Sequence, residues 1–220
     1  MGSELVDVWP LFGLVVRTPR LELRYPDDAD LAALADMATD IEGPDGFQPF
    51  SIPWHRGTDD EVRRRVVQHH WLRRADWTPE AWHLNLVTVV DGAIVGSQGV
   101  FSVGPFAVSR TVSSGSWLNR SHQGQGFGTE MRAAMLHLAF AGLGAERAET
   151  GALEGNEPSQ GVTRKLGYRP NGEAVHVEGD ERRRELRFAL DRADWEPSRR
   201  DDVELVGLEP CLPLFGLSAP

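Results

Sequence analysis

The sequence predicts a mixed α/β domain, and three patterns in its 220 residues carry that prediction. Residues 83–90 and 93–101 each alternate apolar and polar side chains, and Asp91-Gly92 between them forms a two-residue hairpin turn. Residues 59–75 and the run after Thr129 instead repeat apolar side chains every three to four positions, as one face of a helix does. Because strand and helix patterns are mixed along the chain, we expect a sheet flanked by helices.

The first third of the chain predicts a strand, a helix and a long loop before the helix over 59–75. Leu21, Leu23 and Tyr25 alternate with charged residues, which indicates a strand. A helix then starts at Pro26-Asp27-Asp28, and its apolar side consists of Leu31, Leu34, Ala35 and Ala38. Residues 40–58 are rich in Gly and Pro and form a loop. Its apolar residues either line a substrate pocket or cover the core; they are Phe47, Phe50, Ile52 and Trp54.

The second half of the chain predicts alternating strands and helices around a glycine cluster. We expect a strand over 108–118, the glycine-rich turn, a helix from Thr129 and a strand over 147–153. A helix over 158–166 has Pro158 in its first turn and Gly167 as its stop. The segments 174–178 and 184–190 form a closing hairpin around Gly179-Asp180.

The two ends of the chain share an apolar pentapeptide. Pro-Leu-Phe-Gly-Leu occurs at 10–14 and again at 213–217. Such segments are too apolar for free tails, so we expect both to pack onto the body or onto a second subunit, which would allow a homodimer. The length fits one domain over 1–220, with a core of about 15–195 and apolar extensions at 1–14 and 196–220.

Composition excludes several classes of protein. The formal charge of −10 argues against a nucleic-acid partner, which requires a basic face, and suits a cationic acceptor such as an amine. No apolar run approaches the roughly 20 residues of a membrane span, and no leader pattern directs export. With Cys211 as the single cysteine there is no disulfide framework, so we expect a cytoplasmic protein. No metal site is expected.

The sharpest chemical signal is the stretch from Ser116 to Ala141, where glycines stand at 124, 126 and 128 just before a helix. The first amides of a helix lack intrahelical partners and carry partial positive charge, and glycines let a phosphate approach them. The stretch lacks the Lys of a Walker A loop, because Thr129 and Glu130 follow Gly128. Its G-x-G-x-G spacing also differs from the dinucleotide fingerprint, although Glu149 lies at a suitable distance.

Residues 123–128, Q-G-Q-G-F-G, match the Q/R-x-x-G-x-G/A signature of the GCN5-related N-acetyltransferase (GNAT) family. Residues 156–159 (N-E-P-S) and 165–168 (K-L-G-Y) resemble that family's N-x-x-S and K-L-G-F/Y segments. Residues 18–24 (T-P-R-L-E-L-R) resemble the branch that includes the ribosomal-protein-alanine N-acetyltransferases. The resemblance covers roughly residues 15–195 and implies a GNAT-like single domain with a mixed, mostly antiparallel twisted sheet.

The resemblance implies an acyl-CoA-dependent N-acyltransferase, in which an amine attacks the thioester directly in a ternary complex. The donor is acetyl-CoA by default and succinyl-CoA as an alternative, for which Arg56, His69 or His70 would have to hold the second carboxylate. The strand before the glycines would offer a backbone amide to the thioester carbonyl, from the neighbourhood of Trp117 to Asn119. The residues implied in coenzyme A binding are Trp117, Leu118, Asn119, Gln123, Gly124, Gln125, Gly126, Phe127, Gly128, Thr129, Asn156 and Ser159.

The catalytic residues are predicted less sharply than the coenzyme loop. The resemblance implies Ser159 as the acid that protonates the leaving thiolate, with Tyr168 as second choice. The structural alternatives are that Ser159 is an ordinary first-turn residue of the helix and that Tyr168 is a core residue. Asn156 is expected to cap the helix or to bind the pantetheine arm. Relatives often carry Glu on the strand before the glycines, but residues 111–116 contain no carboxylate. The remaining bases are Glu154, Glu149, His83, His122 or a water relayed to bulk.

Two other functions stay open at this point. One is a CoA-binding regulatory module that has lost acyl transfer, as the missing carboxylate suggests. The other is a nucleotide-binding oxidoreductase, which the glycine spacing disfavours. The acceptor amine, whether a protein N-terminus, a lysine or a small molecule, is not specified by these residues.

Overall fold

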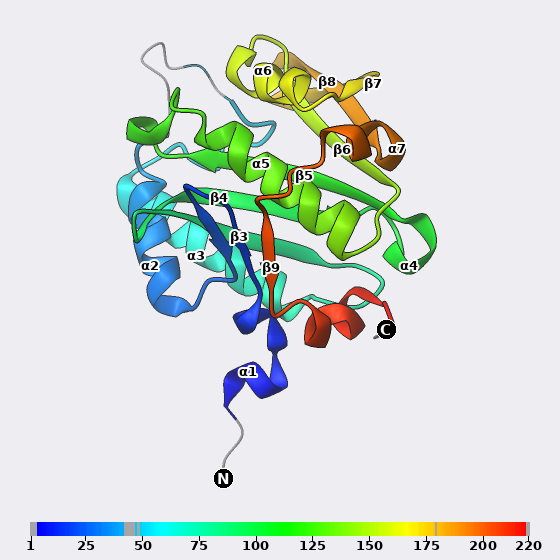
Figure 1. Cartoon of the computed structure of the whole chain (residues 1–220). Helices are drawn as coiled ribbons and strands as arrows, with labels where there is room; N and C mark the ends of the chain where they lie inside the picture. The colour runs from blue at the N-terminus through cyan, green and yellow to red at the C-terminus, as the bar shows by residue number, and fades with distance from the viewer. Residues whose placement is uncertain (1–3, 42–46, 48, 179, 219–220) are drawn as a thin grey trace.

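The computed structural model describes residues 4–41, 47, 49–178 and 180–218 (Figure 1). These residues form a nine-stranded sheet in the order β7-β8-β6-β5-β4-β3-β2-β1-β9. The strands are β1 (Val15–Arg17), β2 (Glu22–Arg24), β3 (His83–Val90), β4 (Ala93–Ser102), β5 (Thr111–Leu118), β6 (Arg147–Leu153), β7 (Arg169–Glu178), β8 (Glu181–Asp191) and β9 (Glu204–Val206). Within the described ranges the β5–β6 pair is parallel and the other seven ladders are antiparallel. The predicted mostly antiparallel α/β fold is confirmed.

Helices cover both faces of the sheet. The α-helices are α1 (Leu5–Val8), α2 (Asp28–Met37), α3 (Asp59–Ala75), α4 (Phe106–Ser109), α5 (Phe127–His137), α6 (Glu157–Lys165) and α7 (Arg192–Trp195). Short 3-10 turns are η1 (Pro10–Gly13), η2 (Arg120–His122), η4 (Glu196–Ser198) and η5 (Glu209–Phe215), and α5 continues into a π-helical turn η3 (Leu138–Gly142). No helix in the described part of the chain is both long and apolar enough to cross a membrane.

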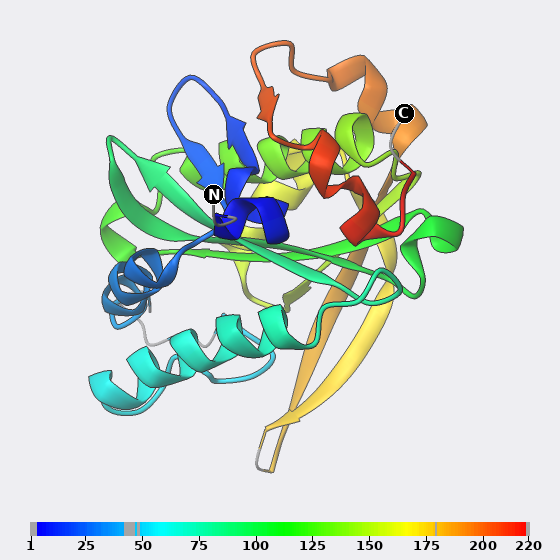
Figure 2. The same ribbon diagram turned by 90° about the horizontal axis from the view of Figure 1, so that it is seen from below.

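The core is divided by the sheet into two clusters. The larger cluster fills the space between the sheet and α5, with Met131, Met135 and Leu138 fully buried there. The smaller cluster joins the opposite face to α2 and α3 through residues such as Leu34, Val66 and Val87. Figure 2 shows α2 and α3 on one side of the sheet and α5 on the other.

Local signals account for the elements that were predicted closely. The helix α3 spans the predicted range because Thr58 caps it, accepting a hydrogen bond from the Glu61 amide. The β3–β4 hairpin turns at Asp91 and Gly92, whose φ angles of 49° and 79° are those of a tight primed turn. Asn156 caps α6 by accepting from the Ser159 amide, which is one of the two roles predicted for it.

Both copies of the terminal pentapeptide pack onto the chain's own core. Leu11, Leu14 and Phe215 are fully buried in the larger cluster, as is Cys211. The C-terminal copy follows β9, which pairs with β1. Of the two placements expected for these segments, the described residues show the first, packing onto the body.

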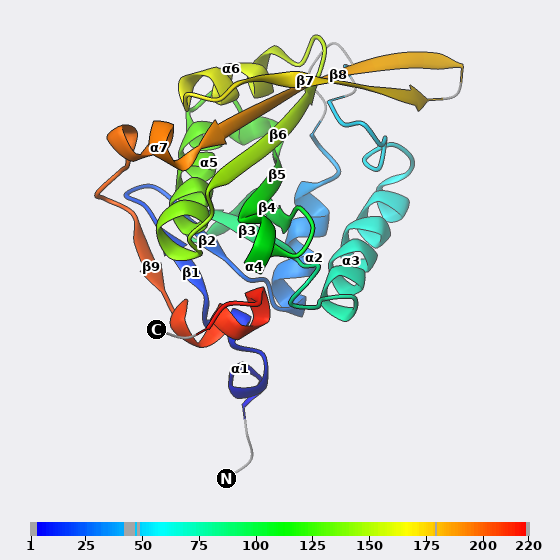
Figure 3. The ribbon, with the colours of Figure 1, turned by 90° about the vertical axis from the view of Figure 1, so that its right-hand side faces the viewer.

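Three elements differ from the prediction. The strand expected over 108–118 begins only at Thr111, because α4 occupies 106–109 and Arg110 adopts a left-handed conformation with φ 46°. The strand β1 and the edge strand β9 were not predicted. The closing hairpin is longer than expected, and Figures 2 and 3 show β7 and β8 extending past the body on the side of α3. Part of its predicted turn, Gly179, lies outside the described residues.

Candidate functional site

The glycine-rich turn between β5 and α5 presents a row of unpaired backbone amides. Gly124 and Gly126 have φ of 73° and 86°, values that favour glycine. The neighbouring amides are used, since Gln123 N–H donates to the Arg120 carbonyl and Glu130 N–H donates to the Gly126 carbonyl. The amides of residues 124–128 donate to no described part of the chain. Because they lie at the N-terminus of α5, they suit an anion such as a phosphate.

The side chains of this turn fix its shape. Gln123 Nε2 donates to the carbonyl oxygens of Ile41 (3.0 Å) and Leu118 (2.9 Å). Gln125 Nε2 donates to the Ser121 carbonyl at 2.7 Å. The side chains of Gln123 and Gln125, both predicted at the coenzyme, are therefore engaged with the protein backbone. The turn offers its backbone amides to a ligand.

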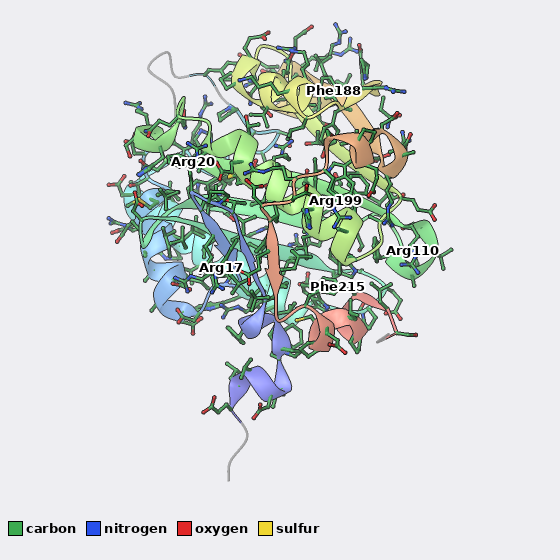
Figure 4. All side chains as sticks on the ribbon, viewed as in Figure 1. Arg17, Arg20, Arg110, Phe188, Arg199 and Phe215 are labelled. Carbon is green, nitrogen blue, oxygen red and sulfur yellow. The ribbon has the colours of Figure 1, made fainter. Side chains whose placement is uncertain are left out.

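Arg20, on the turn between β1 and β2, lies against the start of α5 (Figure 4). Its Nε donates to Glu130 Oε2 at 2.6 Å, and its Nη1 donates to the Gln125 carbonyl at 3.2 Å. The guanidinium stacks over the Phe127 ring, 4.8 Å from its centroid. The side chain is half-exposed, so a positive charge stands beside the unpaired amides. This residue was part of the motif quoted from the sequence but was given no role there.

The glycine-rich turn lies next to a split in the sheet, where β5 and β6 separate. The parallel β5–β6 ladder ends at the Ser114–Thr150 pair, although β5 continues to Leu118 and β6 to Leu153. We call this split the fork. Alternate residues of a strand direct their N–H groups to the same side. Since the Asn119 amide donates to the Val95 carbonyl on the β4 side, the amides of Leu118 and Ser116 point to the open edge.

Within the predicted neighbourhood of Trp117 to Asn119, Leu118 is thus the residue whose amide faces the fork. Asn119 has a structural role, because its Oδ1 accepts from the Ser121 amide and its Nδ2 donates to the Met37 carbonyl. Trp117 packs its ring near Trp54, at 5.7 Å between centroids, on the side of α2 and α3. In the loop over 40–58, Phe50 and Trp54 therefore cover the smaller core, whereas Phe47 lies against Gly155.

On the α5 side, the fork is filled by polar groups that sequence reasoning missed. Arg132 is 4% exposed and donates from Nη1 to Thr150 Oγ1 (3.3 Å) and from Nη2 to Ser116 Oγ (3.1 Å). The Tyr168 hydroxyl lies beside Arg132 and Ser114 but meets the geometry of a hydrogen bond with neither. Arg132 falls between the apolar positions of α5, so only the tertiary structure reveals that it is buried.

On the α3 side, the centre of the sheet is open. Asn85, Gly99 and Gly115 lie opposite one another on β3, β4 and β5 and so share a face. Gly115 is exposed, and a Cβ added there would meet nothing within 4 Å. Asn85 Nδ2 is 3.4 Å from His69 Nε2, which links this row to α3. A second substrate can therefore approach the fork from the face opposite α5.

The predicted catalytic residues lie in different places. Ser159 is in the first turn of α6, partly exposed, and its hydroxyl forms no hydrogen bond with the described chain. Tyr168 is 5% exposed, and burial raises its pKa while the positive charge of Arg132 works against that rise. Glu154 is exposed and pairs with Arg184 at 3.1 Å. The structure leaves Ser159 free to donate and makes Tyr168 a buried residue.

The candidate bases are mostly engaged. Glu149 Oε1 accepts from Arg147 Nε at 3.2 Å and lies opposite Ser113, near the fork on the α3 face. His83 stacks on Phe101, and burial lowers its pKa, which keeps the ring neutral.

The remaining candidate histidines, His122, His69 and His70, and Arg56 lie away from the α5 side of the fork. His122 Nδ1 is 2.9 Å from Ser121 Oγ beside the glycine turn. His69 and His70 are on α3, where burial lowers the pKa of His70 to about 3. Arg56 is exposed in the loop before α3.

The N-terminus of α5, with its unpaired amides, lies next to the split between β5 and β6. This arrangement suits an elongated cosubstrate that carries a phosphate. The sequence model of the acetyltransferase (GNAT) domain matches residues 20–169, more than half of the chain. The chain belongs to this family, and the predicted family resemblance is confirmed.

Individual relatives agree with this assignment. The probable N-acetyltransferase YjcK of Bacillus subtilis (strain 168) is 28% identical over 141 residues, covering 62% of this chain and 75% of that protein. Among solved structures, RimL, a ribosomal L7/L12 α-N-protein acetyltransferase in complex with coenzyme A, has a TM-score of 0.63 at 20% identity, covering 80% of this chain and 97% of that one. A GCN5-related N-acetyltransferase from Brucella melitensis has a TM-score of 0.66 at 16% identity, covering 83% and 80%. These two structures share the fold with this chain.

Proposed function

We propose that the chain transfers an acyl group from acyl-coenzyme A to a primary amine by direct attack in a ternary complex. Acetyl-CoA is the default donor and succinyl-CoA the alternative. The observation that carries the proposal is the continuity between the unpaired amides of residues 124–128 and the open edge of β5. The amides would hold the pyrophosphate, with Arg20 adding positive charge beside them. The pantetheine arm would lie along the free edge of β5, as an added strand does.

Three chemical needs follow from attack of an amine on a thioester. The nitrogen forms the new amide bond, the C–S bond breaks, and the proton lost by the amine must be balanced by the proton gained by the thiolate. The Ser116 amide, which points into the fork two residues before Leu118, would stabilise the oxyanion, because the pantetheine arm takes up the strand edge at Leu118, nearer the turn. The free hydroxyl of Ser159 would protonate the thiolate.

The acceptor would enter over Gly115 from the α3 side. Glu149 lies nearest to this entrance among the candidate bases, because it stands opposite Ser113 in the β5–β6 ladder. Because its carboxylate is engaged with Arg147, a water between Glu149 and the amine is the route we propose for the proton.

The test measures coenzyme A binding by calorimetry and release of free thiol from acetyl- or succinyl-CoA with a panel of amines. The panel contains a peptide N-terminus, a lysine side chain and small amines. In Gly126→Asp a carboxylate faces the phosphates, and we expect affinity for coenzyme A to fall about 100-fold, as for one strong charge-assisted contact. Gly104→Asp is the matched control, because Gly104 also has positive φ (67°) but lies outside the turn, and a Cβ added there would meet nothing within 4 Å.

Undiminished coenzyme A affinity in Gly126→Asp would contradict the proposed phosphate site. Coenzyme A binding without thiol release from any donor and amine would instead favour the regulatory module.

A further inference from the structure

Arg132 is a buried cation without a carboxylate partner. Its side chain lies between α5 and the fork and is 4% exposed. The guanidinium donates to the hydroxyls of Thr150 and Ser116, and its Nε is buried with no acceptor. Among the described residues, no carboxylate lies within ion-pair distance of it, and its further polar neighbour is the Tyr168 hydroxyl. Buried arginines in proteins are normally paired with an anion.

The groups around Arg132 are also incompletely bonded. The buried Tyr168 hydroxyl has no hydrogen-bond partner. Gln98 stands opposite Ser116 on β4, donates to the carbonyls of Gly99 and Gly115, and leaves its buried Oε1 without a donor. A buried polar group without a partner is costly, so three of them on adjoining elements around Ser116 indicate a place that a ligand completes. Hydroxyl groups alone do not neutralise the guanidinium.

Arg132 also lies where the acyl end of the proposed donor would arrive. Arg132 contacts Thr150, the last residue of β6 that pairs with β5, and Ser116, which lies on β5 beyond that ladder. It therefore lies at the closed end of the fork. From Leu118, beside the glycine turn, to Ser114 the strand spans about 13 Å at 3.3 Å per residue. An extended pantetheine arm that starts at the turn covers this span and directs the acyl group at the guanidinium.

We infer that the fork selects acyl-coenzyme A donors whose acyl group ends in a carboxylate, and that Arg132 binds this carboxylate. The inference rests on the proposed function and narrows its donor to the class that succinyl-CoA represents. A guanidinium matches a carboxylate with paired N–H donors, and the Tyr168 hydroxyl can add a third. An acetyl group would instead leave an apolar methyl against a buried charge. The residues that the sequence suggested for this task, Arg56, His69 and His70, lie elsewhere.

The first test uses the unaltered protein and three donors. Succinyl-CoA is compared with butyryl-CoA, which has the same number of acyl carbons without the carboxylate, and with acetyl-CoA. We expect kcat/KM for succinyl-CoA to exceed that for butyryl-CoA by about 10- to 100-fold, the range for hydrogen bonds to a buried charged group. Equal values for succinyl- and butyryl-CoA would overturn the inference while leaving acyl transfer itself intact. Absence of binding by all three donors would overturn the proposed function as well.

The second test replaces the guanidinium. In Arg132→Leu we expect the ratio of kcat/KM for succinyl-CoA to that for butyryl-CoA to fall by the same about 10- to 100-fold. Arg164→Leu, on the exposed side of α6, is the control, and it should keep the ratio of the unaltered protein. If Arg132→Leu lowers both donors equally, Arg132 only braces the fork and the inference is wrong. The comparison of donors on the unaltered protein decides the question even if this variant does not fold.

Discussion

The ion pair between Glu130 and Arg20 ties the turn before β2 to the first turn of α5, and Glu130→Gln tests its contribution. Glu130 is 5% exposed and accepts from Thr18 Oγ1 (2.7 Å) and from Arg20 Nε (2.6 Å). An amide nitrogen cannot accept a hydrogen bond, so in the variant one side of residue 130 faces a donor without bonding to it. The variant keeps the size of the side chain, and the expected effect is therefore electrostatic.

The structure sets the size of this effect. A hydrogen bond to a charged group contributes about 1.5–3 kcal/mol, and the half-exposed side chain of Arg20 places this pair at the lower end. We expect the free energy of unfolding to fall by about 1.5–2 kcal/mol at pH 7. For a chain of 220 residues this lowers Tm by about 3–8 °C.

The lowered pKa of Glu130 determines in which direction the difference in stability changes with pH. Burial acts to raise the pKa of Glu130, but the hydrogen bonds from Thr18 and Arg20 and the charge of Arg20 outweigh it, so the pKa lies below its ordinary value. A carboxyl with a lowered pKa in the folded state contributes its full stabilisation above the unfolded-state pKa of about 4.3. This contribution shrinks as the pH falls below that value and is lost once the pH has passed the folded-state pKa.

Urea unfolding of both proteins, from pH 7 down to the lowest pH that still gives a cooperative transition, measures the difference. The control is Glu157→Gln, which breaks the exposed pair with Arg164 and should cost less than about 0.5 kcal/mol. The reasoning is refuted if Glu130→Gln unfolds at the same urea concentration as the unaltered protein at pH 7. It is equally refuted if a difference at pH 7 stays constant well below pH 4.

Two further predictions concern the C-terminal segment. Phe215 is fully buried, and its ring centroid is 4.9 Å from that of Trp82 and 5.5 Å from that of Trp77. Phe215→Ala should therefore lower the free energy of unfolding, measured by urea titration, by about 3–5 kcal/mol. A loss below about 1 kcal/mol would mean that this segment does not pack onto the core. Burial raises the pKa of Cys211 to about 11, so a thiol reagent at pH 8 should label it only after unfolding. Labelling of the native protein as fast as of a free thiol would contradict that.

Elements with local signals could be predicted from the sequence, and elements held by distant partners could not. The β3–β4 hairpin and α3 follow from turn and cap residues next to them. The strands β1 and β9 have three residues each and exist because β1 pairs with both β2 and β9, so periodicity cannot detect them. The strand error at residues 108–110 has a similar cause, since Val108 is an apolar residue that is 84% exposed on α4.

The candidate site divides in the same way. The glycine turn is a contiguous motif, and its position before α5 was predictable because a glycine cluster and an amphipathic run are both local. The contacts of the side chains around it are not local. Gln123 and Gln125 were expected at the coenzyme, but they bond to carbonyl groups of the protein, which sequence spacing cannot show. Arg132 was missed because its burial depends on where two strands separate.

The position of the fork has a physical reason in two glycines. Gly115 and Gly151 are the first residues beyond the Ser114–Thr150 pair, one on each strand, and both are exposed. Glycine pairs weakly in a strand and leaves no side chain to pack, so the ladder can end there at low cost. Of the two positions, Gly115 leaves the α3 face open, whereas the Glu185 side chain occupies the space beside Gly151 and Arg132 fills the α5 face. Under the proposed acyl transfer, an amine would enter over Gly115 from one side, and the cation on the other side, rather than the glycine turn alone, would select the acyl group.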